Sequence, residues 1–273
     1  MRIGRFGAPD GAWFWGLIDP DTDTVRRILG DLSDWAAIAA AEDRHRLPVS
    51  TQAEPLARFR LLAPLDPQGR VFGVGANYRA HLERLGVSEP PPHPTAFMKP
   101  NSAIIGPGDE IRYPPITAQL DYEVELVIVM GGDESTPLLG FTIGNDVSAR
   151  DAQGLGGLDL FSMKSLDRST PVGPWIVTPA ELNGSSQPKV DIMLRVNGEQ
   201  RQRDNTAVMV WAIPEIISYV DERVELRCGD IIFTGTTAGV GLEDGRFLQP
   251  GDLIEAEIAG IGVLRNVVGH RQP

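Results

Sequence analysis

The alternation of apolar and polar residues divides the chain near residue 65. Before this point, short alternating runs at residues 2–6 and 12–18 flank turns rich in Gly, Asp and Pro, a pattern typical of a small hairpin sheet. Residues 56–65 are expected to connect this part to the rest of the chain. The sequence therefore predicts a small N-terminal β-rich domain over residues 1–65 and a second domain over residues 66–273.

Two segments have helical periodicity. Residues 31–41 are predicted to form a helix, with Asp31 or Ser33 as its N-cap. Residues 208–220 show the clearest helical pattern, in which Pro214 is tolerated only near the first turn.

Strand patterns dominate from residue 71 onward. Residues 71–75 form a continuous apolar run, and residues 122–130 and 191–196 alternate at strand period. Between these strands, residues 77–85 predict one or two helical turns, and the proline-rich residues 88–94 predict a loop.

Glycine turns recur in the second domain. Asn197-Gly198 is a strong two-residue hairpin turn. A Gly-Asp turn opens an apolar run at three places: Gly108-Asp109, Gly229-Asp230 and Gly251-Asp252. No repeat period of about 20–50 residues runs through the chain, so we interpret these turns as repeated hairpins and not as a solenoid. The predicted fold class is mostly β (α+β), a rolled sheet or β-sandwich with few helices.

The composition is that of an ordinary globular protein. Of 273 residues, 42% are hydrophobic and 23% are charged, so the chain can bury a sizeable core without a disulfide. The formal net charge is −12 and no Lys/Arg block stands against it, which argues against nucleic acid and anionic lipid as partners. A site for an anionic substrate therefore has to create a local positive field from a metal, Arg or Lys.

The single cysteine, Cys228, excludes an internal disulfide and a cysteine metal cluster. The first residues lack the apolar core of a signal peptide, and no stretch approaches the ~20 apolar residues of a membrane span. We therefore expect a cytoplasmic protein with no membrane partner.

Two glutamates two residues apart are the first candidate site. Glu123 and Glu125 are predicted to project from one face of a strand that becomes continuously apolar after Leu126. Neighbouring carboxylates near a buried strand repel each other, so either one takes up a proton or a cation lies between them. The alternative is a solvated strand end with two exposed glutamates.

Asp146 adds a third carboxylate at the end of another apolar run. An all-oxygen ligand set favours Mg²⁺ or Mn²⁺, with Ca²⁺ as a further option, over zinc or copper. Three protein ligands leave positions on an octahedral ion for water or for the chelating oxygens of a substrate. We therefore predict that Glu123, Glu125 and Asp146 bind one divalent metal ion.

Several nearby side chains suit a small oxo-acid substrate. Arg150 can bind a carboxylate through two parallel hydrogen bonds, Gln153 can donate and accept, and Lys164 can stabilise an enolate. The glycine-rich stretch around Thr236 can offer backbone amides and a hydroxyl to an anion. Each feature also fits a purely structural role. His81 is more often structural than catalytic when it stands alone, but a carboxylate that orients it would make it a general base toward water.

A series of motifs runs in order over roughly residues 70–270. They are Gly73-Val-Gly-Ala-Asn77-Tyr78-Arg-Ala-His81, Phe97-Met-Lys99-Pro100, Asp121-Tyr-Glu123-Val-Glu125-Leu, Asn145-Asp146-Val-Ser-Ala-Arg150-Asp151-Ala-Gln153, Lys164-Ser-Leu-Asp167 with Pro171-Val-Gly-Pro174, Val196-Asn-Gly-Glu199, and Gly229-Asp230-Ile-Ile-Phe-Thr-Gly235-Thr236. Through these motifs the chain resembles the fumarylacetoacetate hydrolase superfamily, in particular its bacterial acylpyruvase and 2-hydroxyhepta-2,4-diene-1,7-dioate isomerase-like members.

The resemblance implies a mixed β-roll fold, a homodimer, and Mg²⁺ or Mn²⁺ at the three carboxylates. It implies substrate contacts at Arg150, Gln153, Lys164 and Thr236, and Tyr78 in the first motif is a further candidate substrate-binding residue. The family's reactions on β-diketo and enol acids are C–C bond hydrolysis, decarboxylation and isomerisation. All of them require stabilisation of an enolate of a small oxo acid.

The chain departs from the family pattern beside His81. Family hydrolases commonly pair this histidine with a glutamate three residues later, where this chain has Arg84. The nearest glutamate is Glu83, and one helical residue turns a side chain by about 100°, so Glu83 need not face His81. A broken pair favours an isomerase, tautomerase or decarboxylase. A proline-rich loop that orders on ligand binding would bring Glu83 inward and favour a hydrolase.

The leading hypothesis is a metal-dependent hydrolase that cleaves a C–C bond in an acylpyruvate or a related β-diketo or 2-oxo acid. In this reaction His81 and Glu83 activate water and Lys164 stabilises the enolate. The alternative is an isomerase, tautomerase or decarboxylase of a 2-oxo or 2-hydroxy-dienoic acid that uses the same residues without an activated water. A third possibility is a binding protein that keeps the metal but has lost turnover. The sequence contains no serine-hydrolase elbow, dinucleotide fingerprint or phosphate loop.

Overall fold

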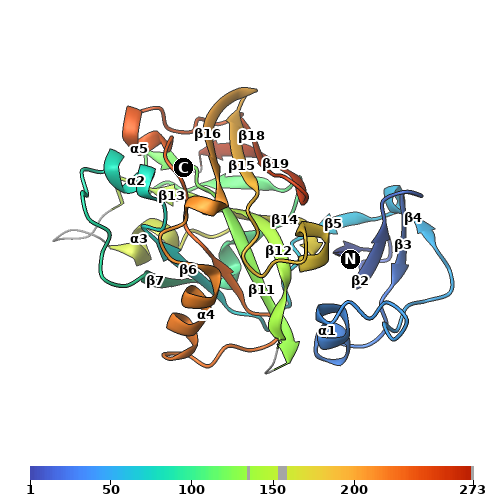
Figure 1. Ribbon diagram of the computed structural model, residues 1–273. Helices are drawn as coiled ribbons and strands as arrows, with labels where there is room; N and C mark the ends of the chain where they lie inside the picture. The colour runs from blue at the N-terminus through green and yellow to red at the C-terminus, as the bar shows by residue number, and fades with distance from the viewer. Residues whose placement is uncertain (134–135, 153–158, 272–273) are drawn as a thin grey trace.

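The computed structural model describes residues 1–133, 136–152 and 159–271. The fold is mostly β with short helices, which confirms the predicted fold class. Figure 1 shows a large β-rich body and a smaller lobe made by the N-terminal residues, drawn in blue. Within the described ranges, no helix is long and apolar enough to cross a membrane.

The N-terminal lobe is a small antiparallel sheet with a helix beside it. Its elements are β1 (Arg2–Gly7), β2 (Trp13–Asp19), β3 (Thr24–Arg27), α1 (Leu32–Ala40), β4 (Glu54–Pro55), the 3₁₀ helix η1 (Leu56–Arg58) and β5 (Arg60–Leu62). β1 and β2 pair from Arg2↔Ile18 to Gly7↔Trp13, which confirms the predicted hairpin. Residues 56–65, predicted as a connection, also contribute a strand to the sheet, because β5 pairs with β1.

α1 confirms the predicted helix and its cap. Asp31 is the N-cap residue, and its backbone N–H donates to the carboxylate of Asp34 at 2.8 Å, which satisfies a donor that the first turn leaves open. On the inner face of α1, Trp35 is fully buried and meets the ring of Trp15 edge to face, with 5.7 Å between ring centroids.

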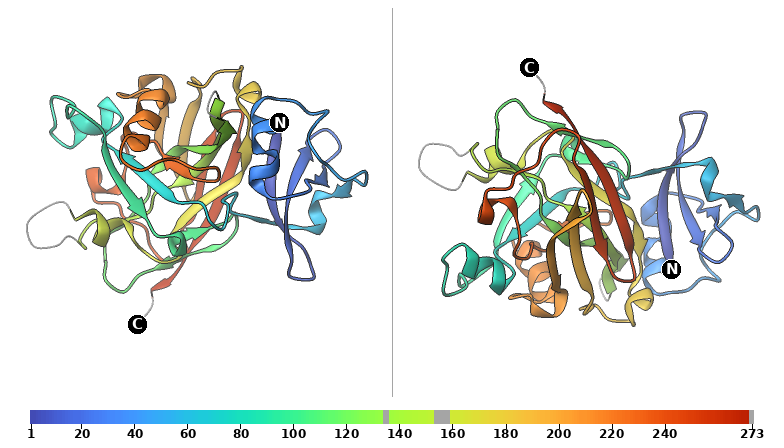
Figure 2. Two further views of the ribbon diagram at one scale, coloured as in Figure 1. Left: turned by 90° about the horizontal axis from the view of Figure 1, so that it is seen from below. Right: turned by 90° about the horizontal axis from the view of Figure 1, so that it is seen from above.

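The lobe shares a core with the body. Ile3 of β1 pairs with Ile176 and packs in one hydrophobic cluster with Val127 and Ile231. Figure 2 shows α1 between the N-terminal strands and the body. The division into two domains at residue 65 stays a prediction.

The body contains two larger sheets and a small two-stranded one. Its strands are β6 (Val71–Gly75), β7 (Thr95–Lys99), β8 (Ile104–Ile105), β9 (Glu110–Tyr113), β10 (Leu120–Asp121), β11 (Val124–Asp133), β12 (Thr136–Asn145), β13 (Ser148–Ala149), β14 (Thr170–Val177), β15 (Asp191–Val196), β16 (Glu199–Asn205), β17 (Ile231–Phe233), β18 (Leu253–Ile258) and β19 (Gly262–Arg271). Its helices are α2 (Arg79–Arg84), η2 (Asn101–Ala103), α3 (Leu160–Lys164), η3 (Pro179–Leu182), η4 (Thr206–Val208), α4 (Ile213–Asp221) and α5 (Gly241–Asp244).

One long sheet extends from the lobe into the body. Over the described residues its order is β4-β3-β2-β1-β14-β12-β11-β17-β6-β7, with β5 on β1 and β8 on β14. The second sheet has the order β16-β15-β18-β19-β9, and β10 pairs with β13 alone. Side chains of the central strands of both sheets form the main hydrophobic core, as in a sandwich.

The centre of the long sheet is built from residues that favour buried strands. β11 is apolar on both faces from Leu126 to Met130, and these side chains are at most 3% exposed. β11 pairs antiparallel with β12, so Val124 at the start of β11 lies opposite Asn145 at the end of β12. This register brings the residues just before β11 next to those just after β12.

The structure corrects the start of one predicted helix. α4 begins at Ile213, whereas the pattern predicted a helix from residue 208. Pro214 lacks an N–H and fits the first turn, so a helix that began at residue 208 would place it in the interior. Residues 206–208 form the separate 3₁₀ turn η4 instead.

The three Gly-Asp turns are confirmed and share one geometry. Each glycine has a positive φ, and each aspartate carboxylate accepts a hydrogen bond from the backbone N–H three residues earlier, at 2.7–2.9 Å. The turns precede β9, β17 and β18. The Asn197-Gly198 turn likewise joins β15 to β16, with positive φ at both residues.

Candidate active site

Three buried carboxylates converge where β11 begins and β12 ends. Glu123 directly precedes β11, Glu125 is the second residue of this strand, and Asp146 follows β12. One oxygen from each carboxylate lies within 4.8 Å of the others, and the residues are only 5%, 3% and 1% exposed. The Asp146 N–H donates to the Glu123 carbonyl at 2.9 Å, which fixes the two chain segments together. The exposed strand end considered as an alternative is therefore wrong.

The pKa values of Glu125 and Glu123 are shifted in opposite directions. Burial, followed by the charges of Asp146 and Glu123, raises the pKa of Glu125 well above its usual range. Burial acts on Glu123 in the same sense, but the Lys164 ammonium and the Arg150 guanidinium outweigh it and lower its pKa to about 2. Glu125 is thus the carboxylate with the weakest compensation by protein cations.

Two lysines and an arginine lie among these carboxylates. Lys164 Nζ donates to Glu123 and, at 2.6 Å, to Asp146. Lys99 Nζ donates to the other oxygen of Asp146 at 2.5 Å. Arg150 donates through Nη2 to Glu123 at 2.5 Å. The predicted roles of Arg150 in substrate binding and of Lys164 in enolate stabilisation stay predictions, and the structure shows both cations paired with carboxylates.

His81 has a carboxylate partner, but it is not the predicted one. Glu83 is exposed on α2, while His81 Nδ1 lies 3.0 Å from an oxygen of Glu243 on α5. The other oxygen of Glu243 accepts a hydrogen bond from the Gly239 N–H at 2.8 Å, and both side chains of the pair are at most 9% exposed. The structure therefore corrects the expected His81–Glu83 pairing and supplies a histidine–carboxylate pair with a different glutamate.

These groups surround one pocket of about 190 Å³, which we call the carboxylate pocket. Its polar and charged lining includes Glu123, Glu125, Asp146, Arg150, Lys164, His81 and Thr236. Its apolar lining includes Val74, Leu85, Phe97, Leu160 and Met163. The pocket is smaller than the ~300–1,000 Å³ typical of drug-sized ligands, so it suits a small molecule.

The remaining predicted substrate contacts differ in their placement. The Thr236 side chain lines the pocket, but its hydroxyl donates to the Val124 carbonyl at 2.9 Å and accepts from Gln202 at the same distance. Tyr78 is fully buried, does not line the pocket, and its hydroxyl has no hydrogen-bond partner among the described residues. Gln153 lies outside the described residues.

The predicted anion-binding turn around Thr236 holds a carboxylate of the protein itself. The Gly235 N–H donates to Glu125 at 2.6 Å, and Gly235 has a positive φ of 97° that only glycine adopts readily. This turn therefore orients one of the three converging carboxylates.

Three residues of the site are not predicted from the sequence: the buried Lys99 and Asp121, and Glu243, whose side chain is 9% exposed. Lys99 and Asp121 stand in motifs that carry the family resemblance, and this was the only signal for them. Glu243 follows the last motif in a glycine-rich stretch and is 162 positions from His81, so no local pattern connects the two.

The donor set fits a hard divalent cation. All three converging groups are carboxylates, the ligand type that Mg²⁺, Mn²⁺ and Ca²⁺ prefer. The raised pKa of Glu125 is a second sign, because it reflects burial and then repulsion by Asp146 and Glu123, and a cation between the carboxylates would offset both. Glu123, Glu125 and Asp146 are thus able to hold a metal ion.

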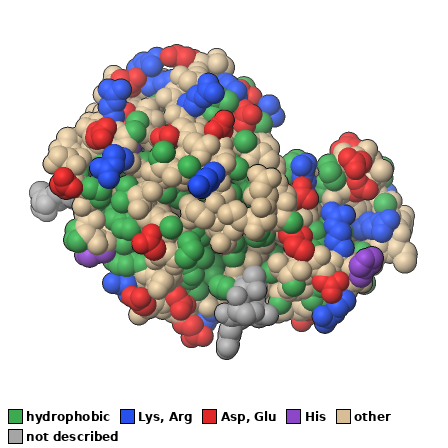
Figure 3. All heavy atoms as spheres, in the orientation of Figure 1, with side chains coloured by type: hydrophobic (Ala, Val, Ile, Leu, Met, Phe, Trp, Pro, Cys, Tyr) green, Lys and Arg blue, Asp and Glu red, His purple; other side chains and the backbone are tan. Residues whose placement is uncertain are grey.

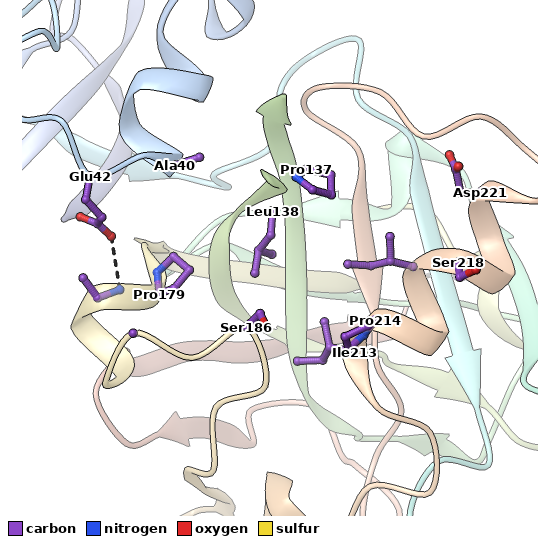
Figure 4. Close-up of a pocket in the computed structure, with 13 residues that line it drawn as sticks. Ala40, Glu42, Pro137, Leu138, Pro179, Ser186, Ile213, Pro214, Ser218 and Asp221 are labelled. Atoms are coloured by element: carbon purple, nitrogen blue, oxygen red, sulfur yellow. Dashed lines mark hydrogen bonds between the residues drawn. The ribbon is translucent and has the colours of Figure 1, made fainter. Parts of the chain in front are cut away.

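A larger cavity of about 690 Å³ lies elsewhere, between α4, β12, η3 and the end of α1 (Figure 4). We call it the apolar cavity, and its walls are mainly Leu138, Pro137, Pro179, Ile213, Pro214 and Ile217. Figure 4 shows Glu42 and Asp221 on opposite sides of it, not facing each other. Figure 3 shows apolar side chains gathered around α4 on the same face of the molecule. The converging carboxylates and His81 do not line this cavity.

Comparison with known proteins gives matches to both parts of the chain. Residues 70–269 match the family model described as fumarylacetoacetate (FAA) hydrolase C-terminal, and residues 1–64 match the model described as Rv2993c-like, N-terminal. Protein Rv2993c of Mycobacterium tuberculosis is 40% identical to this chain, and the match covers 98% of each.

Two further matches carry the name of an activity. The mitochondrial oxaloacetate tautomerase FAHD2A of Bos taurus is 38% identical, over 98% of this chain and 91% of that protein. The crystal structure of 5-carboxymethyl-2-hydroxymuconate delta-isomerase from Mycobacterium smegmatis is 33% identical, covers 100% of both chains and has a TM-score of 0.81.

Proposed function

This chain belongs to the fumarylacetoacetate hydrolase superfamily, and from that premise we propose that it is a divalent-metal-dependent tautomerase or isomerase of a small 2-oxo acid. One observation carries the proposal. His81, whose Nδ1 contacts Glu243, and the three converging carboxylates line the same small pocket. A base beside a cation site is what proton transfer at the carbon next to an oxo group requires.

The chain's own residues divide this reaction between them. Glu243 engages His81 Nδ1, which leaves Nε2 as the ring nitrogen available to a substrate. His81 Nε2 takes a proton from the carbon next to the oxo group, and the electron pair moves to the oxo oxygen to give the enolate. Return of the proton to a carbon or to the oxygen yields the isomeric product, so atoms and charge balance.

The metal site supplies the second half of the chemistry. A divalent ion bound by Glu123, Glu125 and Asp146 would act as a Lewis acid toward the oxo group. Lys164 contacts Glu123 and Asp146, so its positive charge also lies where the enolate oxygen would develop negative charge. The names of the tautomerase and the isomerase that match nearly the whole chain support proton transfer without bond cleavage.

The second candidate is C–C hydrolysis of an acylpyruvate, and the apolar part of the pocket lining favours it. Leu85, Phe97, Leu160 and Met163 line the pocket and suit an alkyl tail better than a second carboxylate. The same His81–Glu243 pair can activate the water that hydrolysis needs, a role that was predicted for Glu83.

Product analysis separates the two candidates. Metal-stripped protein is supplied with Mg²⁺ or Mn²⁺ and mixed with oxaloacetate or acetylpyruvate, and the products are followed by NMR. Metal-dependent interconversion of the oxaloacetate tautomers, with acetylpyruvate left intact, is the expected result. Release of acetate and pyruvate from acetylpyruvate would instead establish the hydrolase. A protein that binds both acids and changes neither would contradict both candidates.

We extend the proposal to Mg²⁺ or Mn²⁺ as the ion, a homodimer, a cytoplasmic setting, and a small oxo acid as the only partner besides a second copy of the chain. Light scattering after size-exclusion chromatography tests the dimer, and metal analysis of the purified protein tests the ion.

A further inference from the structure

Asp121 is a fully buried carboxylate that does not belong to the converging group. One of its oxygens accepts hydrogen bonds from the backbone N–H groups of Gly241 at 2.6 Å and of Tyr122 at 2.8 Å. The other accepts from Arg150 Nε at 2.8 Å and from the Leu242 N–H at 3.0 Å. Four donors from three parts of the chain, at residues 122, 150 and 241–242, thus meet on one side chain.

Two of these donors open α5, the helix that carries Glu243. Gly241 and Leu242 are the first residues of this single turn, and the next residue, Glu243, contacts His81. Arg201 holds the far end of this turn, because it donates to Asp244 at 3.0 Å, so the position of Glu243 also depends on how the first N–H groups of the turn are held. Asp121 supplies that hold from the adjacent strand β10.

A third donor leads to the metal-binding carboxylates. Arg150 donates through Nε to Asp121 and through Nη2 to Glu123, so its guanidinium links the two carboxylates. We infer that Asp121 is a positioning residue that fixes the His81–Glu243 pair relative to the metal-binding carboxylates. This inference rests on the proposed function, because the pair and the carboxylates have to act on one substrate.

The geometry requires a carboxylate at this position. Both oxygens of Asp121 face donors only. An asparagine keeps the shape, but its NH₂ group faces two donors in either orientation of the amide, which leaves buried groups unsatisfied. Aspartate is therefore the side chain that satisfies both α5 and Arg150.

Gly241 provides a second way to perturb this contact without removing a charge. A Cβ at this position would lie 2.8 Å from the Asp121 carboxylate oxygen and 2.7 Å from the Arg246 carbonyl oxygen. Gly241→Ala therefore pushes the start of α5 away from Asp121 and leaves the Asp121–Arg150 contact in place. Gly7→Ala is the matched control, because a Cβ there meets only Leu62 at 3.5 Å, an ordinary contact distance.

The experiment compares wild type, Asp121→Asn, Gly241→Ala and Gly7→Ala as full-length protein. Three quantities are measured: Mn²⁺ affinity by calorimetry, kcat and KM for oxaloacetate tautomerisation, and the tautomer of His81 by ¹⁵N NMR of the imidazole. In the wild type, the Glu243 contact predicts that a neutral His81 carries its proton on Nδ1.

The inference expects Gly241→Ala to lower kcat by about 10²-fold, the size of effect that misplacement of a catalytic group by ~1 Å can cause. Its Mn²⁺ affinity and KM should stay within about twofold of wild type, and His81 should lose its preference for the Nδ1–H tautomer. Asp121→Asn should show the same change at His81 and also bind Mn²⁺ about 10- to 100-fold more weakly, as loss of a residue that supports a metal ligand does. Gly7→Ala should match wild type in every measurement.

A folded Gly241→Ala protein with unchanged kcat and an unchanged His81 tautomer would overturn the inference. So would an Asp121→Asn protein that loses Mn²⁺ affinity while His81 keeps its Nδ1–H tautomer, since Asp121 would then serve Arg150 alone. If Asp121→Asn does not fold, Gly241→Ala decides the question by itself. If wild type turns over no oxo acid, the proposed function fails, but the tautomer and Mn²⁺ measurements still report on the position of Glu243.

Discussion

The carboxylate pocket and the apolar cavity differ in size and in chemistry, and the smaller of the two contains the buried charged groups. The apolar cavity measures about 690 Å³ and the carboxylate pocket about 190 Å³. The smaller one contains buried carboxylates, buried cations and a paired histidine. The larger one is lined mainly by apolar side chains, with single carboxylates at its edges.

Buried charge, and not volume, distinguishes the candidate active site from the larger cavity. A buried charge costs free energy unless it is paired, and each cation of the pocket is held against a carboxylate. Stability alone does not account for these buried ion pairs, because apolar residues of similar volume would fill the same space at no greater cost in free energy. The described residues that line the apolar cavity include no such cluster of paired charges, so this cavity has no comparable cost in free energy.

The largest expected effect comes from removing a predicted metal ligand. Glu125→Gln keeps the shape of the side chain but removes its charge, so metal binding and turnover should both fall. A Lewis-acid contribution of several kcal/mol corresponds to a loss of at least about 10³-fold in kcat/KM. Mn²⁺ titration by calorimetry and tautomerisation kinetics measure the two effects. Normal Mn²⁺ affinity in this variant would remove Glu125 from the metal site.

A smaller loss is expected when the histidine loses its partner. Glu243→Gln should lower kcat by about 10²-fold, the lower end of what general acid–base groups contribute, with Mn²⁺ affinity unchanged. Glu83→Gln is the matched control on the neighbouring helix, since its side chain is exposed. If Glu83→Gln proved the more damaging of the two, the loop closure that brings Glu83 to His81 would replace the Glu243 pairing.

The raised pKa of Glu125 predicts a pH dependence of the metal-free protein. Its folded pKa lies above its unfolded value, so its contribution to stability is fully present below the unfolded pKa and is lost as the pH rises through the folded pKa. The melting temperature of metal-stripped wild type should therefore fall, relative to Glu125→Gln, as the pH rises from about 4.5 toward neutrality. Parallel melting curves for the two proteins across this range would contradict the shift.

The smallest effect on turnover is expected in the apolar cavity. Leu138 is 6% exposed and lines this cavity, so Leu138→Ala should lower the free energy of unfolding by about 2–3 kcal/mol. Its kcat and KM should stay within about twofold of wild type. Denaturant unfolding and steady-state kinetics test the two statements. A large loss of kcat at normal stability would mean that this cavity is coupled to the chemistry.

The sequence predicted the parts of the site that local pattern encodes. Glu123 and Glu125 stand two apart at the start of an apolar strand, and this spacing was enough to predict that their carboxylates lie together. Asp146 could be added because it ends another apolar run, and antiparallel pairing of β11 and β12 places it there. The hairpins and the Gly-Asp turns were predictable for the same reason, since turn residues act over a few positions.

The missed parts depend on contacts between distant segments. Glu243 contacts His81 from a turn whose ends are bonded to Asp121 and Arg201, and none of these pairs is visible in a local window. Glu83 is the glutamate nearest to His81 in sequence, but helical geometry turns it to solvent. The shared core of lobe and body was equally hidden, because periodicity shows which face is apolar and not what it packs against.

The central claim is that a metal ion at Glu123, Glu125 and Asp146 acts together with His81 on a small oxo acid. Its most direct test is the rate at which the enol of oxaloacetate converts to the keto form, followed optically with metal-stripped protein before and after addition of Mn²⁺. We expect a slow reaction without metal, at least about 10³-fold acceleration on adding Mn²⁺ to wild type, and no such recovery with Glu125→Gln. Equal rates with and without Mn²⁺, or full recovery of Glu125→Gln, would contradict it.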